Sequence, residues 1–360
     1  MLRALAIVPS KFDTSPGQRF RIEQWAPGLR AAGIDVTFEA FEDDSLNRVI
    51  YEPGHPIRKA AAVAAAFGRR MTHARKAREF DIVYVFREAA VLGPAVFERW
   101  IRRSGVPFIY DFDDAVFERY VSPSNGYLSL LKCPGKTAAI CRLATHVIAG
   151  NRYLADYARR HNDRVTIVPT TIDTEAYQPV APARKRVPVV GWSGSHSTVQ
   201  HLRRIDTALK RLAATHEFRL KVIGTNSYPL DGVAVDAQPW RRDTETVDLA
   251  EIDIGVMPLP DDRWSRGKCG LKALQYMALG IPAICSPVGV NSEIIRHDEN
   301  GLLASTEDEW VTTLGALLDN QERRERLGSA GRRTVEAAYS AHAAIPVVAQ
   351  LFRNTAGARS

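Results

Sequence analysis

Residues 267–286 read Gly267-Lys268-Cys269-Gly270-Leu271-Lys272-Ala273-Leu274-Gln275-Tyr276-Met277-Ala278-Leu279-Gly280-Ile281-Pro282-Ala283-Ile284-Cys285-Ser286. Leu271, Leu274 and Ala278 fall on one face of a helix, and Gly280 stands where a helix ends. Pro282 then opens an apolar strand. A glycine-rich turn, a helix and a buried strand in this order indicate a nucleotide-binding α/β unit, in which the N–H groups at the helix start bind phosphate.

Apolar runs alternate with helix-like segments along the whole chain, which predicts parallel sheets with crossover helices. Residues 178–188 are rich in proline and cations, so we expect a linker there. The fold class is therefore α/β, with Rossmann-like doubly wound domains at 1–180 and 187–337 that face each other across an interdomain cleft. The expected strands are 3–8, 34–40, 82–86, 107–111, 146–149, 165–168, 189–194, 218–223, 254–257, 282–286 and 301–304.

Composition and charge limit the classes of partner. The chain has 360 residues, a net charge of +7 and a pI near 9.3, which favours anionic partners. Part of the basic excess lies at 58–78, a helix-forming segment; we interpret it as a solvated face, and contact with an anionic membrane is the alternative. Four cysteines without metal-ligand spacing argue against a zinc site or a disulfide framework.

The start of the chain lacks the pattern of a signal peptide, and no apolar run reaches the ~18 residues of a membrane span. We therefore expect a cytoplasmic protein, with the inner membrane face as the place of any peripheral contact. The oligomeric state cannot be predicted from this sequence.

Two more strand-to-helix turns have the composition of phosphate sites. In the first, Gly17 allows close backbone approach, and Arg19 and Arg21 add charge; a turn with solvated arginines is the alternative. The helix that follows contains Pro27-Gly28, where we expect a kink or a division into two short helices.

In the second turn, Gly194 and Ser195 precede a helix and are placed to meet a diphosphate. Ser197 and Gln200 have the spacing of a capping box. The helix should bury a stripe formed by Val199, Leu202, Ile205, Leu209 and Leu212.

The run from Gln275 to Glu293 resembles the signature of the retaining GT-B glycosyltransferases of family 4. Asn300–Leu303 and the tail from Leu327 to Ser340 are similar as well. The resemblance implies two facing Rossmann-like domains, an acceptor on the first, and a nucleotide-diphosphate sugar held largely by the second. It also implies a C-terminal helix, residues 338–360, that packs back on the N-terminal domain.

The chain departs from the family pattern at two places. The usual Glu-x7-Glu pair is replaced by Gly267 and Gln275; an amide still bonds a ribose hydroxyl, and Asp261 or Asp262 is expected to replace the sugar contact. The Arg and Lys that usually follow the first strand of the second domain are absent as well, because Trp192 and the Thr198/Val199 region stand there. We expect Lys268, helped by Arg266 or Lys272, to supply the missing charge.

Near the strand end Tyr110–Asp114, Asp113 stands where the family has a histidine. Its carboxylate is expected to orient the acceptor or to stabilise positive charge at the anomeric carbon. Paired carboxylates also suit a divalent cation, and a helix cap or surface loop is the third interpretation. We expect no metal and no cofactor, because GT-B enzymes rarely need one.

The expected site residues fall into three groups. The catalytic group is Asp113, Lys268 and Arg19. The acceptor-binding group is Arg21, Glu88, Asp111, Asp114 and Asn151. The donor-binding group is Gly17, Gly194, Ser195, Trp240, Asp261, Asp262, Lys268, Cys269, Gly270, Leu271 and Gln275.

The sequence therefore predicts a hexosyl transfer from a nucleotide-diphosphate sugar to an unidentified acceptor, with retention of configuration. No Gly-x-Gly-x-x-Gly follows a strand and no P-loop motif occurs, which disfavours oxidoreductases and NTPases. The alternatives are a sugar-nucleotide epimerase of similar fold and an inactive transferase-like protein. A nucleic-acid-binding protein is a weaker alternative, since no RNA- or DNA-binding motif is present.

Overall fold

The computed structural model describes residues 1–46, 55–118, 133, 135–179, 187–195 and 197–358. The chain forms two compact units, residues 1–170 with 344–360, and residues 171–343. The division falls before the expected end of the first domain at residue 180, because the segment after Thr170 bonds within the second unit. Ile172 forms a bridge with Ser340, and Arg332 donates to the carbonyl of Thr174 at 2.9 Å. Most of the expected linker, residues 180–186, lies outside the described residues.

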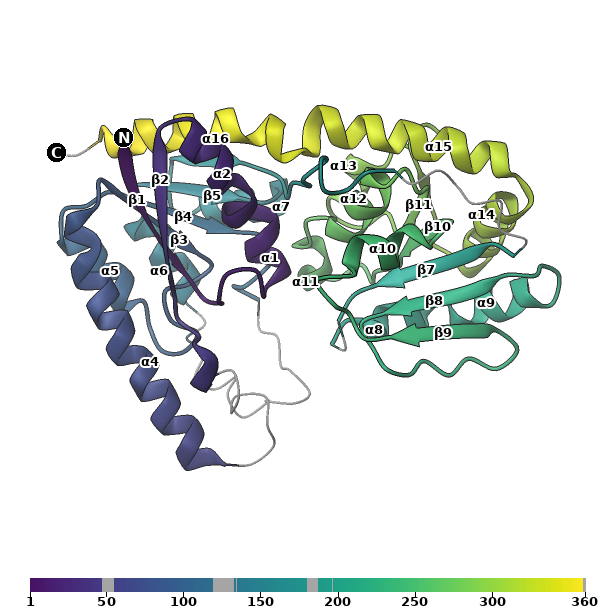
Figure 1. Ribbon diagram of the computed structural model, residues 1–360, viewed down its shortest axis with the longest axis horizontal. Helices are drawn as coiled ribbons and strands as arrows, with labels where there is room; N and C mark the ends of the chain where they lie inside the picture. Colours follow the sequence, from purple (N-terminus) through teal and green to yellow (C-terminus); the bar gives the residue numbers. More distant parts are fainter. Residues whose placement is uncertain (47–54, 119–132, 134, 180–186, 196, 359–360) are drawn as a thin grey trace. The chain divides into compact units, whose positions relative to one another are not determined.

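The first unit contains a parallel sheet with the strand order β2-β1-β3-β4-β5-β6 (Figure 1). Its strands β3 and β4 are buried along their whole length, as expected for parallel strands covered on both faces. The strands are β1 (Leu2–Val8), β2 (Ile34–Ala40), β3 (Ile82–Phe86), β4 (Phe108–Phe112), β5 (His146–Ala149) and β6 (Val165–Ile167). The helices are α1 (Pro16–Gln18), α2 (Gln24–Ala31), α4 (Pro56–Lys76), α5 (Val96–Arg103), α6 (Lys136–Leu143), α7 (Arg152–Arg159) and most of α16 (Ala341–Ala356).

The helical segment after Gly17 is broken, but not where the sequence predicted. Its backbone leaves helical geometry at Phe20 and Arg21. Pro27 instead lies inside α2, at its fourth residue, and the helix continues past it to Ala31. Gly28 lies against α16, since a Cβ built there would stand 2.3 Å from Cδ1 of Ile345.

The second unit contains a parallel sheet with the order β12-β11-β10-β7-β8-β9 (Figure 1). The sequence did not predict β9, an edge strand with half-exposed and exposed side chains and therefore no clear apolar run. The strands are β7 (Val189–Ser193), β8 (Arg219–Ile223), β9 (Ala234–Gln238), β10 (Ile254–Met257), β11 (Ala283–Cys285) and β12 (Leu302–Leu303). The helices are α8 (Val199–Leu202), α9 (Asp206–Ala213), α10 (Glu245–Ala250), α11 (Arg263–Arg266), α12 (Leu271–Ala278), α13 (Asn291–Ile294), α14 (Glu307–Asp319) and α15 (Gln321–Thr334).

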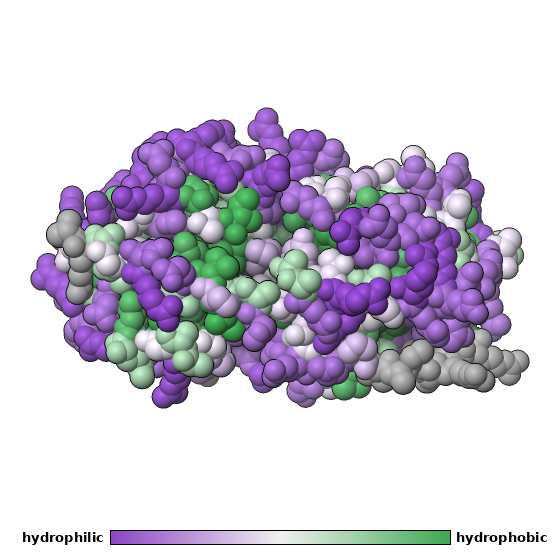
Figure 2. All heavy atoms as spheres, turned by 90° about the horizontal axis from the view of Figure 1, so that it is seen from above, coloured by the Kyte–Doolittle hydropathy of each residue, from purple (hydrophilic) through white to green (hydrophobic). Residues whose placement is uncertain are grey.

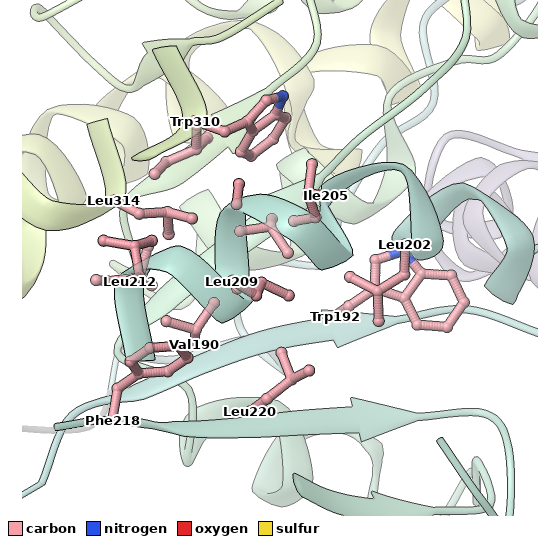
Figure 3. Close-up of a cluster of buried hydrophobic side chains, with 14 of the residues drawn as sticks. Val190, Trp192, Leu202, Ile205, Leu209, Leu212, Phe218, Leu220, Trp310 and Leu314 are labelled. Carbon is pink, nitrogen blue, oxygen red and sulfur yellow. The ribbon is translucent and has the colours of Figure 1, made fainter. Parts of the chain in front are cut away.

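The predicted apolar stripe after Gly194 forms one side of the second unit's core. Figure 3 shows Leu202, Ile205, Leu209 and Leu212 against Val190, Trp192 and Leu220 of the sheet, with Trp310 and Leu314 of α14 alongside. The predicted capping box is wrong. Thr198 is the N-cap of α8, one residue later than expected, and the Gln200 amide donates to the Ser197 carbonyl at 3.2 Å.

Part of the basic charge on α4 is used inside the first unit. Arg70 is buried and donates to the carbonyls of Val8 and Glu39 at 2.7 and 2.8 Å. Arg69 pairs with Asp43 at 2.8 Å. Figure 2 shows a surface that is mainly hydrophilic in this view, with groups of hydrophobic residues between. None of the helices in the described ranges is long and apolar enough to span a membrane. Contact of residues 58–78 with an anionic membrane stays a prediction.

Candidate active site

In doubly wound sheets, ligands bind beyond the carboxyl ends of the strands, at the point where the strand order reverses. In the first unit this point lies between β1 and β3, which are followed by Gly17 and Arg87. In the second it lies between β7 and β10, which are followed by Gly194 and Asp261. Each unit therefore places predicted site residues at its own switch point.

The turn before α12 is held in a conformation that needs glycine. Gly270 has φ +71°, and a Cβ there would stand 2.3 Å from Cδ1 of Ile294. Gly289 packs against the backbone of Arg266, since a Cβ built on Gly289 would stand 2.7 Å from the Arg266 carbonyl oxygen. Loop and turn thus fix the start of α12, where the amides of the first helical turn, beginning at Leu271, have no carbonyl partner within the helix. The predicted helix start at Gly270-Leu271 is confirmed.

Lysines gather at this helix start. Lys268 Nζ lies 4.8 Å from the centroid of the Trp264 ring, and Lys272 Nζ lies 5.5 Å from that of Trp192. The amide of Ser193 donates to the Tyr276 hydroxyl at 2.9 Å, which joins the end of β7 to α12. The structure therefore brings two of the predicted phosphate turns together, the one at Gly194-Ser195 and the one at Lys268–Leu271.

His201 on α8 reports the positive charge of this region. Its pKa falls to about 4, first because burial disfavours the imidazolium and then because Lys272, Lys268 and Arg204 repel it, while Asp262 opposes the fall. The folded protein thus holds this proton more weakly than the unfolded chain, whose histidine has the ordinary value of 6.5. Stability should therefore be lost as the pH falls from about 6.5 towards 4.

We expect the His201→Gln variant to lose less stability than the wild type between pH 7 and 4.5, measured by urea unfolding. A bound diphosphate adds negative charge beside the lysines, so we also expect it to raise the pKa of His201 in an NMR titration. A His201 pKa unchanged by saturating nucleoside diphosphate would contradict the placement of the anion near Lys268 and Lys272.

Gln275 lies in a buried polar cluster about one turn further along α12 than Leu271. Its Nε2 donates to the Tyr177 hydroxyl at 3.0 Å and to Oε1 of Glu245 at 3.1 Å. The Tyr177 hydroxyl donates to Oε2 of Glu245 at 2.9 Å, and the Trp240 indole donates to its Oε1 at 3.0 Å. The structure thus brings the predicted residues Trp240 and Gln275 together through Glu245.

The two aspartates proposed to contact the sugar make local contacts. Asp261 accepts two hydrogen bonds from Arg266, at 2.6 and 3.0 Å, which lower the pKa of its carboxyl. Asp262 caps α11 by accepting from the Ser265 amide at 2.7 Å. Cys269 is buried. These contacts give Asp261 and Asp262 a structural role, and their part in sugar binding stays a prediction.

In the first unit, Gly17 and Asp113 meet at a third residue, Arg87. Arg87 Nε donates to Asp113 at 2.7 Å, and a Cβ on Gly17 would stand 2.6 Å from Arg87 Nη2 and 2.7 Å from Asp113 Oδ2. Arg87 also has φ +55°, which is unusual for a residue other than glycine and is often found at functional sites. A side chain larger than hydrogen at position 17 would displace this pair.

Arg21 and Asp111 were expected to bind the acceptor, but their side chains have no exposed surface. Arg21 Nε donates to Asp111 Oδ2 at 2.7 Å, and Nη2 lies 2.7 Å from Oδ1 in an ion pair. Nη1 donates to the Val168 carbonyl at 2.9 Å, and the Tyr84 hydroxyl also donates to Asp111. Burial would lower the pKa of Arg21, but the Asp111 carboxylate outweighs it and raises that pKa. The buried pair therefore holds the broken helix against β4, and a part for Arg21 and Asp111 in acceptor binding stays a prediction.

The other predicted residues of this unit are also tied to neighbours. Arg19 pairs with Asp13 at 3.1 Å, and Glu88 pairs with Lys136 at 2.9 Å. Asn151 is buried and caps α7 through the Leu154 amide, and Asp114 accepts from the Ala115 amide. Glu88 remains partly exposed, and its part in acceptor binding stays a prediction.

A cavity of about 1050 Å³ in the second unit lies elsewhere. It is lined by residues such as Pro188, Asp253 and Pro282, which precede β7, β10 and β11. Because it opens at the amino ends of the strands, it is not the candidate active site.

Comparison with known proteins identifies the family. Residues 17–176 match the family model described as Glycosyltransferase Family 4, and residues 187–320 match the one described as Glycosyl transferases group 1. The chain belongs to the family 4, group 1 glycosyltransferases. It is therefore a glycosyltransferase, and the predicted family is confirmed.

Among curated relatives, this glycosyltransferase is 24% identical over 352 residues to a D-inositol 3-phosphate glycosyltransferase of Acidothermus cellulolyticus, covering 87% of this chain and 73% of the relative. A protein of the same name from Stackebrandtia nassauensis is 27% identical over 225 residues, with 52% and 48% covered. The chain thus spans about half the length of the second relative in the matched region.

Solved structures share the fold of the glycosyltransferase. Sucrose-phosphate synthase from Thermosynechococcus elongatus has a TM-score of 0.70 at 16% identity, covering 99% of this chain and all of that one. Anabaena HepE in complex with UDP and glucose has a TM-score of 0.70 at 12% identity, covering 98% and 100%. These likenesses confirm the GT-B fold class predicted from the sequence.

The sequence interpretation missed three residues of the glycosyltransferase. Arg87 had a signal, since it is a charge directly after a fully buried strand. Glu245 had none, because an acidic residue in a first helical turn is common. His201 had the spacing of a solvated helix position. In the described part of the chain, no group of three or more His, Cys, Asp or Glu side chains is arranged to hold a metal ion.

Proposed function

We propose that the glycosyltransferase transfers a hexose from a UDP-sugar, held by the second unit, to a hydroxyl of an acceptor held by the first. The observation that carries the proposal is the start of α12, where helix amides, Lys268 and Lys272 gather. Amides and ammonium groups at a helix N-terminus are the groups that bind a pyrophosphate. The UDP and glucose named for HepE support the choice of donor.

The chemical step is the departure of the nucleoside diphosphate from the anomeric carbon. The lysines and amides stabilise the negative charge that develops on the leaving β-phosphate, which lowers the barrier. We propose retention of configuration, with the acceptor attacking the face that the diphosphate leaves and a phosphate oxygen taking the acceptor proton. Two lysines provide the charge that a divalent cation would otherwise supply, so we propose a metal-independent reaction.

The acceptor is proposed from the relatives. Their printed name refers to D-inositol 3-phosphate, so a phosphorylated cyclitol is the first acceptor to test. In the first unit, the ion pair of Arg87 and Asp113 lies against Gly17, after the carboxyl ends of the strands. A cation beside a carboxylate suits an acceptor that is both hydroxylated and anionic.

The proposal is tested by incubating UDP-glucose with the protein, with and without D-inositol 3-phosphate, and following release of UDP. We expect acceptor-dependent release that EDTA does not abolish, and an α-linked product by NMR. Conversion of the donor to another sugar nucleotide without acceptor would support the epimerase. Absence of UDP release with every sugar nucleotide and acceptor of a wider panel would contradict the proposed function.

A further inference from the structure

Glu245 has no role in the mechanism above, yet its carboxylate organises the buried cluster on α12. Its side chain is 5% exposed and accepts hydrogen bonds from Tyr177, Trp240 and Gln275. Buried carboxylates are costly unless such donors compensate for lost water. The Glu245 carboxylate accepts from three donors that come from separate segments of the chain. We infer that it sets the orientation of these three side chains.

The cluster settles which way the Gln275 amide points. Oε1 of Glu245 accepts from the Trp240 indole N–H, so the Gln275 atom that contacts the same oxygen is assigned as the donating NH₂ group. The single hydroxyl proton of Tyr177 goes to Glu245, so the Tyr177 oxygen accepts the second N–H of Gln275. Both amide protons are used, and an exchanged amide would place two acceptors face to face.

The carbonyl oxygen of Gln275 is thereby left as the group for a ligand. In the part of the chain that the structure describes, the side-chain hydrogen bonds of Gln275 all start from Nε2. Gln275 is four residues after Leu271, about 6 Å along the helix from the proposed phosphate position. The next group of a nucleotide beyond its α-phosphate is the ribose, whose hydroxyls are donors that match a carbonyl acceptor.

Glu245 also fixes Trp240. The indole N–H is bonded to the carboxylate, and the ring is partly exposed. An aromatic ring held at one edge in this way offers its face to a nucleobase, and base stacking on an aromatic side chain contributes about 1–3 kcal/mol. Ribose and base are neighbours in the same ligand, as Gln275 and Trp240 are neighbours on the same carboxylate.

We propose that Glu245 is a positioning residue for the nucleoside of the donor: it turns the Gln275 carbonyl oxygen towards a ribose hydroxyl and holds the Trp240 ring for the base. This inference rests on the proposed donor site of the second unit. Gln275 then acts as a pure acceptor, as the carboxylate usual at its position would.

The proposal makes an unusual prediction for Gln275→Glu, which restores the residue common in the family. The new carboxylate would stand about 3 Å from Glu245, and two carboxylates at that distance cannot both ionise. We expect this variant to bind nucleotide more weakly than the wild type. Exchanging both residues, as Glu245→Gln with Gln275→Glu, restores one amide and one carboxylate and should restore binding.

The test measures, by calorimetry, the affinity for the tightest binder among UDP, GDP and ADP and for its 2′,3′-dideoxy analogue. Loss of one hydrogen bond should make the wild type bind the analogue about 5- to 10-fold more weakly. The ratio of the two dissociation constants, dideoxy analogue over ribonucleotide, is the ribose ratio. We expect Glu245→Ala and Gln275→Glu to reduce the ribose ratio to about one, and the exchanged pair to recover it. Glu251→Gln, which removes a charge from the partly exposed end of α10, is the matched control and should keep the ratio.

A merely structural cluster would lower the unfolding temperature of Glu245→Ala but leave its ribose ratio at the wild-type value, and that result would overturn the proposal. Equal binding of the ribonucleotide and its dideoxy analogue by the wild type would also overturn the role proposed for Glu245, but it would leave the proposed function intact. Failure of the wild type to bind any of the three nucleotides would contradict the proposed donor site itself.

Discussion

The variant Lys268→Ala/Lys272→Ala is expected to turn over about 10²- to 10⁴-fold more slowly than the wild type. Each lysine can form a charge-assisted hydrogen bond with the departing diphosphate, worth about 1.5–3 kcal/mol, and each 1.36 kcal/mol corresponds to about tenfold in rate. Both ammonium groups lie at the start of α12, over Trp264 and Trp192 respectively. The measurement is kcat/KM for release of nucleoside diphosphate, with the single variants beside the double one.

Arg266→Ala is the matched control, because it removes a cation from the same segment. Arg266 is bound to Asp261 through two hydrogen bonds and is half exposed, so its loss should change the rate less than tenfold. An unchanged rate in the double lysine variant, or an equal loss of rate in the arginine control, would contradict the proposal that Lys268 and Lys272 stabilise the charge of the leaving diphosphate.

Asp111→Ala should destabilise the first unit by about 3–5 kcal/mol, because it leaves the Arg21 guanidinium buried without its counter-charge. The measurement is urea unfolding followed through tryptophan fluorescence, and Trp25 beside Arg21 lies within this unit. The double variant Arg21→Met/Asp111→Asn removes both charges and keeps a partner for Tyr84. It should cost less than Asp111→Ala alone.

The two interpretations of Asp111 differ in their kinetics. If Asp111 contacted the acceptor, as its place after a strand first suggested, its replacement would raise the acceptor KM and leave unfolding unchanged. The buried pair predicts the reverse, a lower stability with the acceptor KM of the folded fraction preserved.

Much of the fold follows from the sequence, because fully buried parallel strands are unbroken apolar runs. The run Ile82–Phe86 and the α12 helix start at Gly270 both lie where they were expected. Strand β9 escaped prediction because it lies at the sheet edge and lacks such a run.

The site was less predictable, because its contacts join residues that are distant in the sequence. Glu245 and Gln275 meet across 30 positions, and Arg21 and Asp111 across 90. Short patterns identify residue types that suit phosphate or carboxylate chemistry. They do not show whether a side chain such as that of Arg21 ends in solvent or in the core.

A crystal structure of the protein with UDP tests the central claim most directly. The account predicts the diphosphate at the start of α12, against the amides near Leu271, with Lys268 and Lys272 as its cationic partners. A diphosphate bound elsewhere on the second unit, away from these groups, would contradict it.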